Sequence, residues 1–177
     1  MGAYEKLTEH FAKLSHLNGA AAMLHWDAAA MMPKGGAGAR ADQLATLSLM
    51  AHEMLCAPEV ADLLAKVQEA GALAALGAWE QANVREMARA RSHATALPGD
   101  LVTALSRAGS SCEMVWRSAL ADDDFAALSP YLDEVVGLVR QAAQAKGAAF
   151  DCAPYDALLS EYEPGLTADE VDQHFDA

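Results

Sequence analysis

Residues 24–47 read LHWDAAAMMPKGGAGARADQLATL, and this stretch decides the fold because it joins two helical segments through a tight loop. The residues up to Asp27 continue a helical run. Pro33 and the glycines that follow it force the chain out of the helix. Arg40 opens the next run, which carries a Leu-Ala-x-Leu face at 44–47. The stretch therefore predicts two helices that meet at a short connection.

Asp27 lies near the end of the first helical run, where the helix dipole disfavours a negative charge. We expect compensation either from the backbone N–H groups of Gly35 and Gly36 or from an ion pair with Arg40. A merely exposed Asp27 is the remaining alternative. Trp26, at the edge of the apolar stripe, is expected in the core. The predicted structural loop comprises Trp26, Asp27, Pro33, Gly35, Gly36 and Arg40.

Apolar residues recur at steps of three and four along nearly the whole chain, as on one face of an α-helix. The chain has 177 residues, is rich in alanine and contains 6% aromatic residues, which favours helices over strands. We expect one all-α domain of about seven or eight helices. The predicted helices are a long one through 7–24, then 39–56, 58–71, 73–96, 101–119, one from 129–130 through 143, 154–162 and a last one after 167.

The net charge of −13 argues against binding to nucleic acid or to anionic membrane surfaces. Residues 100–177 carry 4 Lys and Arg against 15 Asp and Glu, which is typical of a solvated acidic face. No apolar stretch is long enough to span a membrane. Three widely spaced cysteines predict reduced, mostly buried thiols in a cytoplasmic protein.

The segment from His52 to Cys56 reads His-Glu-Met-Leu-Cys and resembles the zincin motif His-Glu-x-x-His with cysteine in the last position. On a helix the two outer side chains share a face, and both can bind Zn²⁺. The sequence offers no third ligand, so a packed thiol is the favoured interpretation. We assign no catalytic residue and no metal ligand within this chain.

Two further groups of ionisable residues have the wrong spacing for a catalytic or metal site. Glu170 and His174 are four apart, whereas di-iron bundles use Glu-x-x-His, so a solvent-facing pair is expected. Glu161 and Glu163 are two apart and face different directions on a helix. Arg85 and Glu86, near Asn83, are expected to form a polar contact between helices, and Trp79 is expected on the apolar face of its helix.

Two charged segments have the pattern of helix caps. The acidic run 122–124 lies between helices and offers a cap residue. Thr167 and Glu170 have capping-box spacing and predict a helix that has only about ten residues to run. Val171 and Phe175 form an apolar stripe that needs a partner, which suggests a piece of a longer protein. The alternative is a short docking helix at a natural C-terminus.

The spacing Trp-Asp-x4-Met-Pro-x-Gly-Gly-x3-Arg-x2-Gln-Leu-Ala-x-Leu at 26–47 resembles the N-terminal region of the thermostable carboxypeptidase Taq family of metallocarboxypeptidases. Other segments agree in order, and the resemblance covers nearly the whole chain. Ala30 departs from the family pattern, in which we expect threonine. The agreeing segments are 83–86, 97–102, Trp116 with 124–125, and 154–165.

The resemblance implies an all-helical, cytoplasmic and usually homodimeric enzyme that is much longer than this chain. Its zinc would be held by a His-Glu-x-x-His helix and a later glutamate, and it would remove C-terminal residues from peptides. None of those residues matches a position in 1–177, so the resemblance implies a wall or cap of the cleft that is inactive alone. The runner-up is a stand-alone helical protein-interaction module, followed by a small metal-binding bundle.

Overall fold

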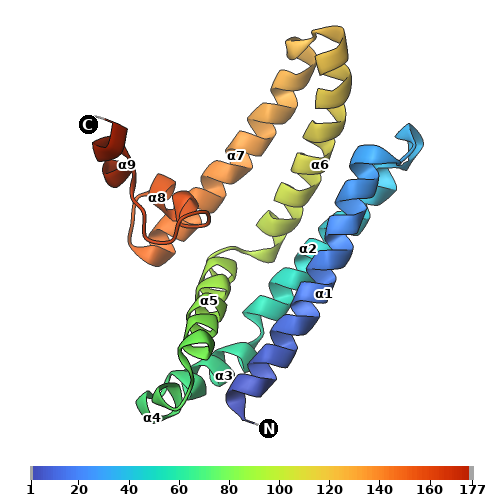
Figure 1. Ribbon diagram of the computed structural model, residues 1–177. Helices are drawn as coiled ribbons and strands as arrows, with labels where there is room; N and C mark the ends of the chain where they lie inside the picture. Colours follow the sequence, from blue (N-terminus) through green and yellow to red (C-terminus); the bar gives the residue numbers. More distant parts are fainter. Residues whose placement is uncertain (1, 176–177) are drawn as a thin grey trace. The chain divides into compact units, whose positions relative to one another are not determined.

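The computed structural model describes residues 2–175, apart from the side chain of Lys34, and every regular element in that range is a helix (Figure 1). The all-α prediction is therefore confirmed, with two short helices beyond the number expected. The elements are α1 (Ala3–Ala30), η1 (Lys34–Gly36), α2 (Ala37–Cys56), α3 (Pro58–Gln68), α4 (Ala70–Ala74), α5 (Ala78–Thr95), α6 (Gly99–Asp122), α7 (Phe125–Phe150), α8 (Pro154–Leu159) and α9 (Ala168–Phe175).

The chain divides into two compact units, Met1–Ser110 and Ser111–Ala177. The boundary falls inside α6, where the helical period continues without a proline or a loop. The apolar pattern does not mark this boundary, and for that reason the sequence indicated one domain. None of the helices in the described part of the chain has the length and apolar character that crossing a bilayer requires.

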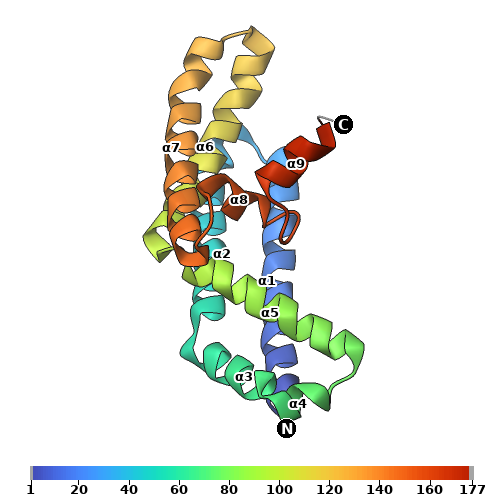
Figure 2. The ribbon, with the colours of Figure 1, turned by 90° about the vertical axis from the view of Figure 1, so that its left-hand side faces the viewer.

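The first unit is built on α1 and α2, which run antiparallel and side by side in both views (Figures 1 and 2). Its core lies at the start of α1, where the fully buried Leu7 packs against α3 and α5. The apolar positions of α3 step by three and four, so all of them face this cluster. The buried residues of the cluster are Leu7, Val60, Leu63, Leu64, Val67 and Val84.

Two polar contacts connect α5 to the elements around it. The Asn83 Nδ2 donates to the Tyr4 hydroxyl at 3.0 Å and so joins α5 to α1. The Arg91 Nη1 donates to the carbonyls of Leu55 and Ala57 at 2.5 and 3.2 Å. The Leu55 carbonyl lies in the last turn of α2, where no intrahelical donor remains, and the Ala57 carbonyl also accepts from the Val60 N–H of α3 at 3.0 Å. Arg91 therefore closes the α2–α3 junction.

The contact expected from Glu86 to another helix is wrong, because Glu86 pairs with Arg89 on its own helix at 2.9 Å. The neighbouring Asn83 makes the contact between helices instead. Trp79, expected on the apolar face, is exposed. The α5 helix also begins later than predicted, because the Gly77 N–H donates to the Glu80 side chain at 2.8 Å. Gly71 does not end a helix and lies inside α4.

The second unit contains a hairpin of α6 and α7 around a cluster of Cys112, Ala119 and Leu128. We expected α7 to begin at 129–130, but it begins at Phe125. The Asp124 carboxylate accepts from the Ala127 N–H at 3.0 Å and caps the helix, as the acidic run suggested. Pro130 lies in the second turn, where its missing N–H costs one backbone bond.

A sharp reversal joins α7 to α8. Asp151 adopts a left-handed conformation (φ 53°), and the Cys152 N–H donates to the Gly147 carbonyl at 3.1 Å. A Cβ at Gly147 would lie 2.9 Å from the Cys152 carbonyl oxygen, so this close approach of backbone requires glycine.

Substituting Leu7→Ala should destabilise the protein by about 2–5 kcal/mol, because it removes a fully buried side chain and leaves a cavity in the first unit. The free energy of unfolding from urea titration measures the effect. Met23→Ala on the exposed side of the same helix is the control and should change it little. Equal losses in the two variants would contradict this placement of the core.

Candidate functional site

Arg40 is the centre of the loop that the sequence singled out. Its Nη1 lies 2.5 Å from the Asp27 Oδ2 and also donates to the Leu24 carbonyl at 2.9 Å. Its Nε donates to the Gln43 side chain at 3.0 Å. The Arg40 side chain is 18% exposed, so water screens these contacts only in part. One guanidinium thus connects the end of α1 to the beginning of α2.

The ion pair with Arg40 is the arrangement that the structure shows for Asp27, whose backbone also takes part in the loop. The Asp27 carbonyl accepts from the N–H groups of Met31 and Met32 at 2.9 and 2.8 Å and closes the end of α1. The Gly36 N–H donates to the Pro33 carbonyl at 2.8 Å, and Gly36 lies at the N-cap of α2 with φ −83°. The loop is therefore mostly a single 3-10 turn.

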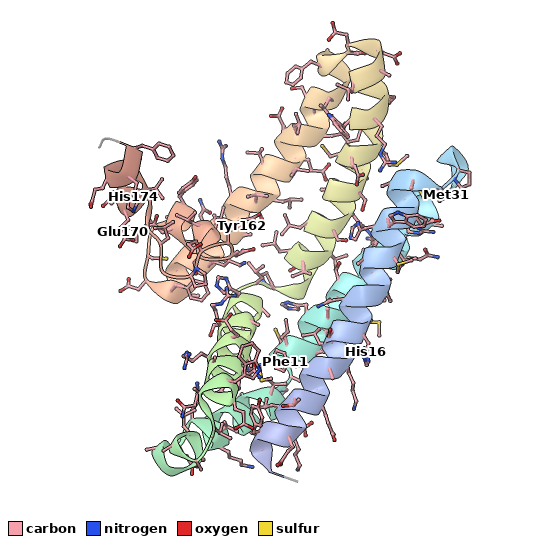
Figure 3. All side chains as sticks on the ribbon, viewed as in Figure 1. Phe11, His16, Met31, Tyr162, Glu170 and His174 are labelled. Atoms are coloured by element: carbon pink, nitrogen blue, oxygen red, sulfur yellow. The ribbon has the colours of Figure 1, made fainter. Side chains whose placement is uncertain are left out.

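Trp26 is not in the core, contrary to expectation. Its side chain is 57% exposed. Each residue advances about 100° around a helix, so a position two residues after Leu24 lies far from the stripe that Leu7 and Leu14 define. At the same end of α1, Met31 also points outward (Figure 3). This end of α1 thus carries large apolar side chains on its surface.

His52 and Cys56 lie together on α2, with the Sγ 3.6 Å from the Nε2. Burial raises the pKa of the Cys56 thiol, and the positive charge of Arg91 only partly opposes this. A thiol with a raised pKa is mostly protonated near neutral pH and is a poor nucleophile. No group of three or more candidate ligands occurs among residues 2–175, so these residues do not fit a zinc site. The packed thiol remains the better interpretation.

The other two cysteines differ from each other in burial. Cys112 is buried in the second unit, as predicted for a reduced thiol. Cys152 is exposed, which contradicts the expectation for mostly buried thiols, because it follows the left-handed Asp151 outside the helix. None of the three is in a disulfide.

Glu170 and His174 are both exposed on α9 and are labelled in Figure 3. The Glu170 Oε2 accepts from the N–H and the hydroxyl of Thr167 at 2.9 and 3.0 Å, and the Glu170 N–H donates back at 3.3 Å. The capping box is therefore confirmed. These hydrogen bonds to Thr167 lower the pKa of Glu170, and the capping role accounts for its position.

Glu161 has a partner that sequence analysis did not find. It forms an ion pair with Lys146 of α7. Lys146 is buried, with only 5% of the residue exposed. A buried ammonium group requires such a partner. The predicted helix ended at residue 143, so the sequence did not place Lys146 on a helix and did not relate it to the segment after α8. The signal was a lone lysine among small residues in an acidic half of the chain.

A pocket lies where α6 turns into α7, and the sequence did not predict it. We call it the tip pocket. Its floor is apolar, and two carboxylates lie at its rim, so it can hold a side chain with an apolar stem and a positive end. Its lining residues are Trp116, Ala119, Leu120, Asp123, Asp124, Phe125 and Leu128.

Residues 6–177 match the model of the carboxypeptidase Taq (M32) metallopeptidase family. The chain belongs to this family. It is 35% identical over 157 residues to thermostable carboxypeptidase 1 of Pyrococcus furiosus, a match that covers 89% of this chain and 30% of the relative. It is 33% identical over 177 residues to thermostable carboxypeptidase 1 of Thermus thermophilus, covering 96% of this chain and 34% of the relative.

Solved structures with the same fold cover nearly the whole of this chain. The crystal structure of BsuCP matches with a TM-score of 0.90 and 25% identity, over 98% of this chain and 34% of that one. Metallocarboxypeptidase 1 of Trypanosoma cruzi matches with a TM-score of 0.77 and 30% identity, over 97% and 34%. The chain spans about a third of the length of the M32 relatives that it matches.

Substituting Arg40→Lys should lower the free energy of unfolding by about 1–2 kcal/mol, because an ammonium group cannot reproduce the fixed fork of donors to Asp27, Leu24 and Gln43. Urea denaturation measures the loss. Arg107→Lys is the matched control, since its pair with Asp42 is exposed on both sides and should be worth under about 0.5 kcal/mol. Unchanged stability in the Arg40 variant would contradict the role of this contact.

The cap of α9 should weaken in acid. The pKa of Glu170 is lowered in the folded chain, so its stabilising effect is present above the unfolded pKa and is lost as pH falls through the folded pKa. NMR titration of the Glu170 carboxyl carbon measures its protonation, and the backbone signals of α9 measure the loss of the cap. In Thr167→Ala the pKa should rise towards its ordinary value, because the hydroxyl bond is lost. A Glu170 carboxyl that titrates as in an unfolded peptide would be evidence against the cap.

Proposed function

We propose that this chain is the N-terminal helical part of a zinc-dependent carboxypeptidase that removes C-terminal residues from peptides. The observation that carries the proposal is the family match over 6–177, combined with coverage of about a third of the relatives' length. The residues that hold the metal would lie outside 1–177. The chain alone would then be inactive.

The contribution of this part would be structural, as a wall or cap of the substrate cleft. The loop of Trp26, Asp27, Pro33, Gly35, Gly36 and Arg40 would fix the angle between α1 and α2. Stiff elements hold a reactive site in place better than loops do. No step of hydrolysis is assigned to residues 2–175.

Two further properties belong to this proposal. A homodimer is supported by the exposed apolar side chains of Met23 and Trp26 on α1 and of Met31 directly after it, because such patches mark interfaces. A cytoplasmic location is supported by the three cysteines, none of which is in a disulfide.

The alternative function is a helical module that binds a protein partner and has no enzymatic activity. The tip pocket is the observation that favours it. Reading the gene beyond codon 177 separates the two. A His-Glu-x-x-His segment within the same reading frame supports the enzyme, and its absence supports the module.

The purified chain should contain less than one zinc per molecule and should release no C-terminal amino acids from peptides, since residues 2–175 hold no cluster of three ligands. Elemental analysis and amino-acid release from a synthetic peptide measure this. One equivalent of zinc that disappears in Cys56→Ala would show a metal site at His52 and Cys56 and would contradict the proposal.

A chimera that joins this chain to the remaining two-thirds of Thermus thermophilus thermostable carboxypeptidase 1 tests whether the chain can serve as the N-terminal part of a carboxypeptidase. The chimera should bind zinc and release C-terminal residues. A chimera that folds cooperatively and binds zinc but has no activity would count against a shared role for the first third. The unaltered Thermus enzyme serves as the control.

A further inference from the structure

The tip pocket results from the spacing of large and small side chains along α6. Trp116, Ala119 and Leu120 lie three and four residues apart on α6, so they share one face, and Asp123 follows directly after the end of the helix. The small Ala119 leaves a hollow that its larger neighbours surround. The reversal into α7 then adds Phe125 and Leu128 of α7 to the lining of the hollow.

The floor of the pocket is fixed, whereas its walls are open to solvent. Ala119 and Leu128 at the floor belong to the buried cluster of the second unit. Leu120 is 65% exposed and Phe125 is 69% exposed, and Trp116 is also exposed. Large apolar side chains around a formed hollow are typical of a site that a partner side chain fills.

The rim of the pocket is acidic and has no basic residue among its lining residues. Asp124 uses one carboxylate oxygen to cap α7, and Asp123 stands next to it with φ 53°. Residues 111–177 carry 3 Lys and Arg against 14 Asp and Glu. Of those basic residues, Arg117 bonds to Glu113 and Lys146 to Glu161. The local potential therefore favours a cation.

We propose that the tip pocket binds a segment of another protein that presents an arginine or lysine beside an apolar side chain. The apolar side chain would contact Leu120 and the floor. The cation would lie against the rings of Trp116 or Phe125 and pair with Asp123. The acidic second unit of another copy is disfavoured as the occupant of this pocket, because residues 111–177 offer few cations to pair with Asp123. This inference does not depend on the proposed enzyme function.

The test uses a fluorescent helical peptide with arginines and leucines on one face, and it measures binding by anisotropy at low salt. Asp123→Asn removes the rim charge and keeps the fold, because asparagine tolerates a left-handed conformation. It should weaken binding roughly fivefold. Asp133→Asn removes the same charge from an exposed position of α7 outside the pocket and should have little effect.

Phe125→Ala should also weaken binding, whereas Tyr155→Ala, at an exposed aromatic residue outside the pocket, should not. Circular dichroism checks that each variant keeps its helices. Three results would overturn the proposal: no binding by the unaltered chain, equal loss in the Asp123 and Asp133 variants, or equal affinity for a peptide with glutamate in place of arginine. Self-association that blocks the pocket, seen by sedimentation, would assign the surface to a second copy instead.

Discussion

The Arg40 guanidinium is the interaction on which the arrangement of the first two helices depends. It offsets the unfavourable carboxylate of Asp27 near the end of α1 and also holds the Leu24 carbonyl. Helices as rich in alanine as α1 and α2 gain little from interlocking side chains, so their crossing needs a directional contact. The charge-assisted bonds supply this direction at the loop, while Leu7 supplies apolar burial at the other end of α1.

Local signals in the sequence predicted local structure well. The dipole argument predicted a partner for Asp27 and named Arg40 as one of two candidates, and the Thr167–Glu170 cap followed from its spacing. The helical class and most helix bodies followed from periodicity. Boundaries were less accurate where caps compete with prolines and glycines. Asp124 begins α7 ahead of Pro130, and Glu80 fixes the beginning of α5 at a position the apolar pattern did not mark.

Features that depend on packing between distant segments were not predictable from one sequence. Lys146 meets Glu161 because α8 folds back along α7, and no local pattern encodes that return. Trp26 shows that residue type alone can mislead. Its large apolar side chain suggested burial, but its angular position on the helix leaves it exposed. The tip pocket depends on the small side chain of Ala119. The apolar pattern of the sequence marks Ala119 only as a core position and does not indicate a hollow there.

The buried Lys146 has a consequence for how the chain can be cut. Residues 147–177 contain no lysine or arginine, so Lys146 is the nearest upstream point at which a protease specific for these residues can act on that segment. In the folded molecule its side chain is covered and engaged by a carboxylate. The acidic segment that follows is therefore shielded twice from trypsin-like enzymes, first by its composition and then by the packing of its one upstream cleavage point.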